Sequence, residues 1–360
     1  MSPMLDYGWA PITGVLSGRE KFIEAPIAEV YDLAVDPNER TNLSGREAAR
    51  QQRLAARLGE FHAALPGAAA PEDSEVARRL RALGYVSGGA TPKARYTEAD
   101  DPKRLIGLDT AIQDVVTLYQ GGDIPAALAR VQEVLRQRPD MPLALQHLAY
   151  LQRQSGDLGA AVTTLKRALA LNPEDTDTAA LLGAYLNEVG RPREAAAVLA
   201  VYAERKSPEL DVLMARGAAL AGIGQTAEAN ATFERALAID PSNAAAKANL
   251  GTVSLGVRDY PRARTLLEEA LALDPDVSRA HNALGVIAAE TGHPDEAITH
   301  WKRAVELNPR EWDTLFNLGK LLRREGREAE ALPYVELFVR TAPPALYARD
   351  IAQLRATLPR

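Results

Sequence analysis

The chain of 360 residues contains no cysteine. This absence excludes disulfide bonds, thiolate metal sites and cysteine nucleophiles. Histidine is scarce as well, and its five copies are spread along the sequence without the short spacing that is typical of metal ligands. They are His62, His147, His281, His293 and His300. We therefore expect no metal and no other cofactor.

An excess of basic charge and long apolar runs are also missing. The formal net charge is −6, so the chain lacks the basic character of nucleic-acid-binding proteins and we expect no nucleic-acid partner. No run of about 18 apolar residues occurs, so the sequence predicts no membrane span. The first residues include Asp6 and do not resemble a secretion signal. The default expectation is a cytoplasmic location, and export stays open if the N terminus is truncated.

Proline recurs at a fixed interval between residues 101 and 344. Six prolines are separated by 34, 68, 34, 34 and 34 residues: Pro139, Pro173, Pro241, Pro275, Pro309 and Pro343. The marker missing from the double gap falls at Ser207, which is followed directly by Pro208. A repeat of this length predicts one structural unit that is copied along the chain and stacked on its neighbours.

Aligning the sequence on these prolines gives seven units, each of which is predicted to form two helices. The units are residues 105–141, 142–175, 176–209, 210–243, 244–277, 278–311 and 312–345. The last five carry glycine at their eighth position: Gly183, Gly217, Gly251, Gly285 and Gly319. Small residues of this kind allow two helices to approach closely.

Every unit carries an alanine at its twentieth position, which lies in the second predicted helix. These alanines are Ala127, Ala161, Ala195, Ala229, Ala263, Ala297 and Ala331. A bulky residue follows four positions later: Val131, Leu165, Leu199, Phe233, Leu267, Trp301 and Val335. We expect the alanine to sit at the helix contact and the bulky residue to fill space against the neighbouring unit.

This pattern resembles the tetratricopeptide repeat over about two thirds of the chain. A good single instance is Leu315, Leu318, Gly319, Ala331 and Pro343. The resemblance implies a mostly α fold: a right-handed superhelical solenoid of helix–turn–helix repeats across residues 102–345. Residues 346–360 are predicted to form a capping helix, which such arrays need. Its expected apolar face is Leu346, Ile351, Leu354 and Leu358.

Residues 1–90 have a different character and predict a small α+β segment. Residues 12–16 and 21–24 are short β-prone runs around Ser17-Gly18, which favours a hairpin, and residues 28–33 give a third strand. Helical periodicity follows over residues 45–64, and a second short helix is predicted from Ser74 to Leu83. Residues 91–101 are predicted to be a linker.

Several short motifs in this segment resemble the C-terminal end of sulfatases. They are Tyr7-Gly8-Trp9, residues 18–23, residues 29–33, residues 36–39 and Asn42-Leu43, and residues 80–85 are similar to the closing segment of sulfatases that carry repeats. The resemblance implies a small antiparallel sheet followed by a helix. The family's C/S-x-P-x-R motif is missing, and Asp100-Asp101 does not replace its metal pair, so no catalytic residue carries over. A truncated gene, a late start codon and a retained remnant domain all stay open.

The sequence therefore favours a non-enzymatic scaffold that binds a protein or peptide on the concave face of the repeats. Helix phase places positions two, five, nine, twelve and thirteen of the first helices on that face. The candidates are Gln146, Tyr150, Arg153, Asn187, Glu188, Asp211, Met214, Arg279, Asn282, Glu290, Phe316, Lys320, Arg323 and Arg324. Among them, Lys320, Arg323 and Arg324 form a basic edge that either meets an acidic peptide or is simply solvated.

Two other interpretations stay open at this point. The chain is alternatively the C-terminal part of a sulfatase-type hydrolase whose catalytic domain lies upstream. Self-association is the other interpretation, since the strands within residues 12–33 would leave an exposed edge. The partner itself is not identified, because exposed residues vary while buried residues set the repeat geometry.

Overall fold

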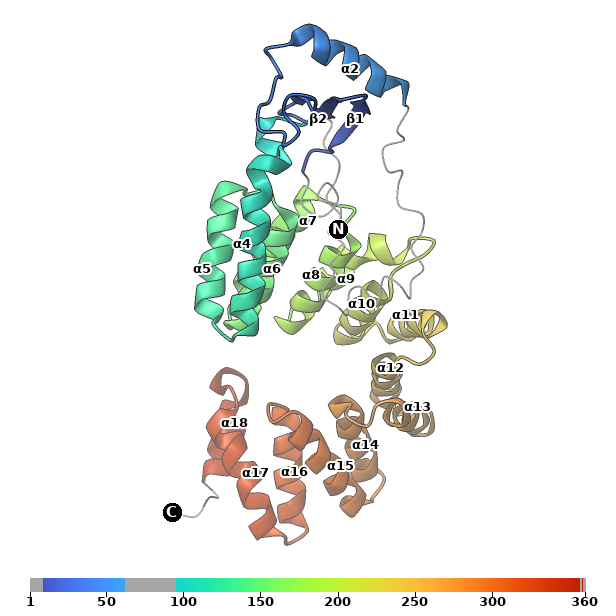
Figure 1. The fold of residues 1–360 in the computed structure, drawn as a ribbon. Helices are drawn as coiled ribbons and strands as arrows, with labels where there is room; N and C mark the ends of the chain where they lie inside the picture. The colour runs from blue at the N-terminus through green and yellow to red at the C-terminus, as the bar shows by residue number, and fades with distance from the viewer. Residues whose placement is uncertain (1–8, 62–94, 357, 359–360) are drawn as a thin grey trace. The chain divides into compact units, whose positions relative to one another are not determined.

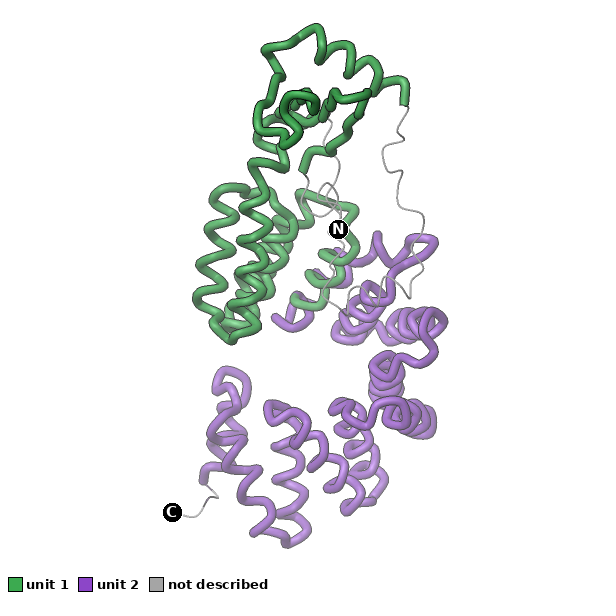
Figure 2. Tube along the Cα trace, in the orientation of Figure 1, with its two compact units in different colours: residues 1–185 green, residues 186–360 purple. Residues whose placement is uncertain are grey.

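The computed structural model describes residues 9–61, 95–356 and 358. It divides into two compact units, residues 1–185 and residues 186–360, and each is described here by itself (Figure 2). The prediction of a mostly α fold with a small N-terminal sheet is confirmed (Figure 1). In the described part of the chain, no helix is both long and apolar enough to cross a membrane.

The N-terminal segment of the first unit is a three-stranded antiparallel sheet covered by one helix. The strands are β1 (Thr13–Ser17), β2 (Glu20–Glu24) and β3 (Glu29–Asp32), in the order β1-β2-β3, and the helix is α2 (Ala48–Glu60). Val15, Phe22 and Val30 face one side of the sheet and are buried with Leu54 of α2. The three predicted strands are present. The predicted helix ends four residues early, at Glu60, and the one predicted for Ser74 to Leu83 lies outside the described residues.

Two buried acidic residues join the sheet to the first repeat. The carboxylate of Asp100 pairs with Arg138 Nη2 at 2.9 Å, and both side chains are buried. The Asp100 carbonyl accepts a hydrogen bond from the Ala10 amide at 2.9 Å. The Asp101 carboxylate accepts the Ile27 amide at 2.7 Å. Buried carboxylates are stable only when they are paired and hydrogen-bonded. These contacts therefore hold the end of the predicted linker against both the N-terminal segment and the first repeat.

Seven helical pairs follow, with short turns between the members of each pair. The first four pairs are α4 (Pro102–Gln120) with α5 (Ile124–Gln137), α6 (Pro142–Gln154) with α7 (Leu158–Leu171), α8 (Thr176–Glu188) with α9 (Pro192–Ala203), and α10 (Leu210–Gly222) with α11 (Thr226–Ile239). The last three are α12 (Ala244–Gly256) with α13 (Tyr260–Leu273), α14 (Ser278–Glu290) with α15 (Pro294–Leu307), and α16 (Trp312–Arg324) with α17 (Glu328–Thr341). A short 3-10 helix (Glu98–Asp100) precedes them.

In four repeats, the glycine of the first helix lies directly against the bulky residue of the second helix of the same repeat: Gly217, Gly251, Gly285 and Gly319. A Cβ atom added to Gly285 would lie 2.5 Å from the Trp301 ring, and one added to Gly217 would lie 2.6 Å from the Phe233 ring. The bulky residues were expected to fill space against the neighbouring unit, and Phe233, Leu267 and Trp301 are each buried in a cluster with residues of the next repeat. The close contact with the glycine of their own repeat is an addition that the sequence did not predict. The predicted alanines, such as Ala297, are fully buried.

The final helix, α18 (Pro344–Arg355), covers the end of the last repeat. Ile351 and Leu354 are buried against it as predicted, whereas Leu346 is 75% exposed and does not belong to the apolar face. Leu346 lies in the first turn of the helix, beside a kink at Tyr347 that changes the helical phase. The Tyr347 hydroxyl donates to Asp313 at 2.9 Å, and burial together with this bond raises the pKa of Tyr347 to about 12.

One turn in the array carries backbone strain. The turns within six of the pairs contain a glycine with φ between 72° and 88°: Gly122, Gly156, Gly190, Gly224, Gly292 and Gly326. The same position between α12 and α13 is Arg258, with φ of 61°. A side chain in this left-handed region costs about 1 kcal/mol or more.

We predict that Arg258→Gly raises the free energy of unfolding by about 1 kcal/mol, and that Gly292→Arg lowers it, as measured by urea denaturation. A loss of stability in Arg258→Gly would contradict this account.

The close glycine contact gives a second prediction. Gly285→Ala forces a methyl group into the Trp301 ring and should lower the free energy of unfolding by about 1–3 kcal/mol. Gly256 is the matched control, because it is exposed at the end of α12 and a Cβ atom there meets nothing within 4 Å. Gly256→Ala should leave stability unchanged or slightly raised. Equal effects of the two changes in urea denaturation would refute the proposed contact.

Candidate functional site

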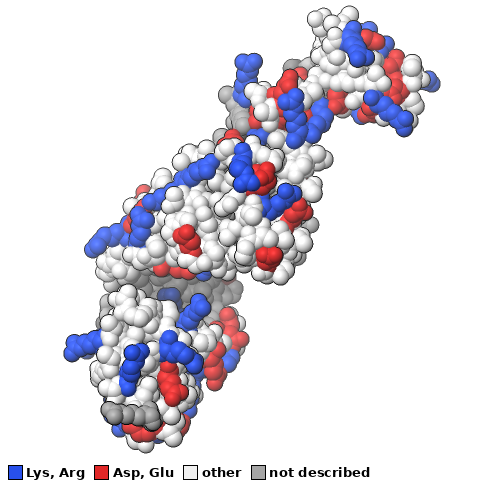
Figure 3. Space-filling view, turned by 90° about the vertical axis from the view of Figure 1, so that its left-hand side faces the viewer, with Lys and Arg blue, Asp and Glu red and all other residues white. Residues whose placement is uncertain are grey.

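The first helices of the repeats carry the predicted partner-binding residues. On the face of the described residues drawn in Figure 3, acidic and basic side chains are interspersed and do not gather into one large patch of a single sign. On this face, charge alone therefore does not select a binding surface. The local contacts of the candidates distinguish them better.

Four residues on three successive first helices form one cluster within residues 1–185. The Tyr150 hydroxyl of α6 donates to the Tyr119 hydroxyl of α4 at 3.2 Å, and the two rings meet edge to face with centroids 5.1 Å apart. This hydrogen bond raises the pKa of Tyr119. Arg153, one turn after Tyr150, places its guanidinium 5.4 Å from the ring centre of Tyr185 on α8. We call Tyr119, Tyr150, Arg153 and Tyr185 the tyrosine–arginine cluster.

Two members of this cluster were predicted and two were missed. Tyr119 lies 34 residues before Arg153 and so corresponds to position twelve when the units are aligned on the prolines. The helix phase used for later units would therefore have found it. Tyr185 occupies position ten of its unit and is only 4% exposed, so no rule for exposed positions selects it. Its contact with Arg153 depends on how α6 packs on α8, which single-unit periodicity does not describe.

Gln146 and Asn187, which were also predicted, make contacts that hold helices together. The Gln146 amide donates to the Thr178 hydroxyl at 2.9 Å and thereby joins α6 to the start of α8. Within residues 186–360, the Asn187 amide donates to the Ala215 carbonyl at 2.8 Å. Both side chains therefore have a structural role in addition to any contact with a partner.

Five further candidates lie on two first helices, α10 and α14: Asp211, Met214, Arg279, Asn282 and Glu290. Asp211, Arg279 and Glu290 are exposed. Met214 is half-buried and packs against the apolar core around α10 and α11. Asn282 is half-buried, and its Oδ1 atom has no hydrogen-bond partner among the described residues. The contacts described for these five residues do not join them into one cluster.

The predicted basic edge on α16 is balanced by neighbouring acidic groups. Arg323 pairs with Glu328 at 2.9 Å, and Arg324 pairs with Glu325 at 3.1 Å. Lys320 instead lies over an aromatic ring, with its Nζ atom 4.9 Å from the centre of Phe316. Exposed pairs of this kind contribute little energy but reduce the local positive potential. The edge is therefore less basic than its sequence predicts.

Comparison with known proteins agrees with the repeat geometry. Residues 118–185 and 220–287 match one family model described as tetratricopeptide repeat, and residues 288–345 match a second with the same description. The chain carries tetratricopeptide repeats. The sulfatase resemblance of the N-terminal segment has no counterpart in these family matches.

Individual relatives of the tetratricopeptide array are distant or short. A Mus musculus protein described as FK506-binding protein-like is 41% identical over 81 residues, which are 22% of this chain and 23% of the mouse protein. The matched stretch thus spans about a quarter of that relative.

Among solved structures, a chain in the crystal structure of the APC/C hetero-tetramer Cut9–Hcn1 has a TM-score of 0.51 at 20% identity. The match covers 59% of this chain and 42% of that one. A chain from the functional characterization of Pseudomonas aeruginosa pilF has a TM-score of 0.45 at 20% identity, covering 56% and 91%. At such identity the likeness to the solved structures concerns the fold alone.

Two histidines of the sixth tetratricopeptide unit lie in contact, although their spacing in the sequence is not typical of metal ligands. His281 Nδ1 on α14 lies 3.1 Å from His300 Nδ1 on α15. His293 is separate from this pair, and its Nδ1 atom lies 3.0 Å from the Thr291 hydroxyl. Within residues 9–61, 95–356 and 358, no three or more histidine, aspartate or glutamate side chains gather in a way that could hold a metal ion.

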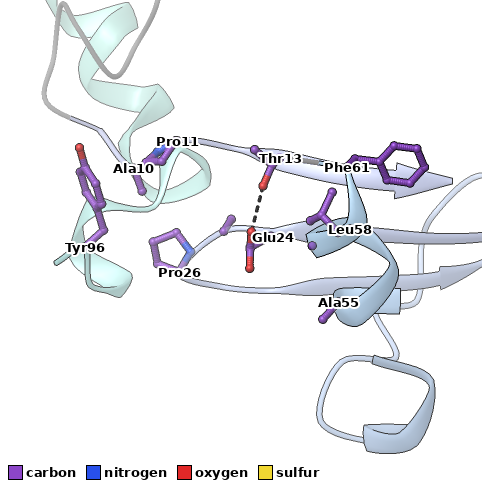
Figure 4. Close-up of a pocket in the computed structure, with 11 residues that line it drawn as sticks. Ala10, Pro11, Thr13, Glu24, Pro26, Ala55, Leu58, Phe61 and Tyr96 are labelled. Atoms are coloured by element: carbon purple, nitrogen blue, oxygen red, sulfur yellow. Dashed lines mark hydrogen bonds between the residues drawn. The ribbon is translucent and has the colours of Figure 1, made fainter. Parts of the chain in front are cut away.

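A cavity of about 500 Å³ opens in the N-terminal segment, before the tetratricopeptide units (Figure 4). Glu24 of β2 is its one charged lining residue among those described, and it accepts a hydrogen bond from the Thr13 hydroxyl at 3.1 Å. Leu58 and Phe61 at the end of α2 and Tyr96 complete much of the wall.

Proposed function

We propose that this chain is an interaction scaffold whose tyrosine–arginine cluster binds an extended segment of a partner protein. The observation that carries the proposal is the continuity of the cluster across α4, α6 and α8. Tyr150 connects α6 to Tyr119, and Arg153 connects it to Tyr185. A segment lying across these helices would therefore meet Tyr119, Tyr150 and Arg153, which are half-buried, while the buried Tyr185 ring helps to hold Arg153 in place.

The chemistry of the cluster suits protein recognition. Tyrosine and arginine are enriched among the residues that dominate binding energy at interfaces. Their aromatic faces provide contact area, while the hydroxyl groups and the guanidinium provide hydrogen bonds to backbone carbonyls or carboxylates. Contacts within the cluster restrict these side chains before a partner arrives. Less conformational entropy is then lost on binding.

The cluster is a better candidate than the basic edge on α16. Arg323 and Arg324 are already engaged by acidic neighbours of their own unit. An acidic peptide would have to compete with those carboxylates. The interpretation that the edge of Lys320, Arg323 and Arg324 is simply solvated is therefore favoured over the acidic-peptide hypothesis.

A second candidate function concerns the N-terminal segment. We infer from its motifs that residues 1–90 correspond to the C-terminal part of a sulfatase-type hydrolase, in which case the repeats would position that enzyme near a partner. The antiparallel sheet followed by α2 supports this, because the resemblance implies that arrangement. Sequencing the gene upstream of Met1 tests it. An in-frame C/S-x-P-x-R motif is the expected result, and a stop codon directly upstream would oppose it.

The scaffold proposal predicts a local loss of binding. Partners are captured with the full chain and identified, and the affinity of each is then measured by isothermal titration calorimetry. Tyr150→Ala and Arg153→Ala should each weaken binding about tenfold or more, as expected for truncation of an interface anchor. Arg136→Ala is the matched control. Arg136 is an exposed arginine on α5, the second helix of the preceding repeat, and it lies outside the tyrosine–arginine cluster.

Equal affinity of the wild-type chain and both cluster variants would refute binding at the cluster. Equal weakening by Arg136→Ala would do so too, because it would indicate a general charge effect. Circular dichroism of each variant establishes that the helices are intact. A partner whose affinity depends on Lys320→Glu and Arg323→Glu instead would move the binding surface to α16.

A further inference from the structure

The imidazole pair of His281 and His300 has a defined hydrogen-bonding arrangement. His281 Nε2 lies 3.1 Å from the carbonyl oxygen of Pro275. A carbonyl oxygen only accepts hydrogen bonds, so Nε2 is the donor and carries the proton of the neutral ring. The Nδ1 atom of His281 is then left with its lone pair. That lone pair faces His300 Nδ1 across 3.1 Å.

We propose that His281 and His300 together chelate a divalent transition-metal ion of the Zn²⁺, Ni²⁺ or Cu²⁺ class through their Nδ1 atoms. Neutral imidazole nitrogen is a preferred ligand of these ions. Each metal–nitrogen bond is about 2.0–2.1 Å long. Two such bonds that meet at 90–110° hold their nitrogen atoms about 3 Å apart, which is the separation present here. The bound ion would replace the hydrogen bond between the rings.

The second hydrogen bond of His281 supports this assignment. Histidine ligands of metals characteristically donate their other ring N–H to a carbonyl or carboxylate, which fixes the tautomer and the ring orientation. The bond from Nε2 to Pro275 supplies that restraint. Burial, reinforced by the neighbouring His281, lowers the pKa of His300, so this ring stays neutral near pH 7. Because His281 carries its proton on Nε2, the hydrogen bond between the rings places the His300 proton on Nδ1. Metal binding would require that proton to move to Nε2 of His300, which frees its Nδ1 lone pair.

The charges around the pair favour a cation. Arg264 of α13 pairs with Glu296 of α15 at 2.6 Å and lies 3.6 Å from Glu268 on its own helix. This group carries two negative charges and one positive charge, so its sum is negative. All three side chains interact electrostatically with His300. A cation bound by the imidazoles would therefore enter a region of net negative charge.

Only two protein ligands are present, so water would complete the coordination of the ion. In the described part of the chain, no third metal-ligating side chain joins the pair to form a larger cluster. Such a site exchanges its ion readily and binds it less tightly than a structural zinc site. Because the ligands come from α14 and α15, the ion would link the two helices of the sixth unit. Binding to the folded state alone would also raise its stability.

Titration of the full chain with ZnCl₂ near pH 7.5, followed by calorimetry, tests the proposal. We expect saturable binding at this pair, and His281→Gln and His300→Gln should each weaken it at least tenfold. His293→Gln is the matched control, because His293 belongs to the same unit but lies apart from the pair, and it should bind like the wild type. Cu²⁺ should bind more tightly than Zn²⁺, and Mg²⁺ should not compete, because it prefers oxygen ligands.

The proposal is overturned if Zn²⁺ does not bind, or if binding persists unchanged in both His281→Gln and His300→Gln. In either case the pair would be an imidazole–imidazole hydrogen bond only. Wild-type NMR gives a test that needs no variant to fold. Addition of Zn²⁺ should shift the ring proton resonances of His281 and His300 and leave those of His293 unchanged, whereas a shift confined to other histidines would refute the assignment.

Discussion

The close contact between a first-helix glycine and a bulky second-helix residue sets the geometry of the later repeats. At Gly217, Gly251, Gly285 and Gly319 there is no room for a Cβ atom, because the partner side chain lies within 2.5–2.8 Å of where it would be. This contact fixes the distance between the two helices of a pair. The buried alanines of the second helices serve the same requirement. Stacking of such pairs then aligns the first helices, whose remaining faces are available for recognition.

Neighbouring repeats are joined by shared apolar clusters and by polar contacts. Leu267 of α13, for example, is buried in one cluster with Leu284 and Ile287 of the next repeat. Between pairs, polar contacts recur, such as Gln146 with Thr178 in the first unit and Arg264 with Glu296 in the second. Partly exposed ion pairs contribute little stability individually, but they fix the angle at which one pair meets the next. The tyrosine–arginine cluster depends on that angle, because its members come from three different pairs.

The repeats could be predicted from the sequence because each one depends on local spacing. The proline interval, Gly285 and the alanines of the second helices predicted an array of helix pairs, and the structure has such an array. What the sequence did not predict depends on packing between different helices and segments. The buried pair of Asp100 with Arg138, the contact of Arg153 with Tyr185, and the meeting of His281 with His300 join residues 19 or more positions apart. Periodicity within one helix carries no information on such pairs.

The central claim is that the first helices α4, α6 and α8 receive the partner. Hydrogen–deuterium exchange of the full chain, with and without a captured partner, tests it most directly because it reports on every helix at once. The account predicts added protection in α4, α6 and α8 around Tyr150 and Arg153, with α5 and α7 unchanged. Protection confined to α5 and α7, or to the sheet of β1, β2 and β3, would contradict it.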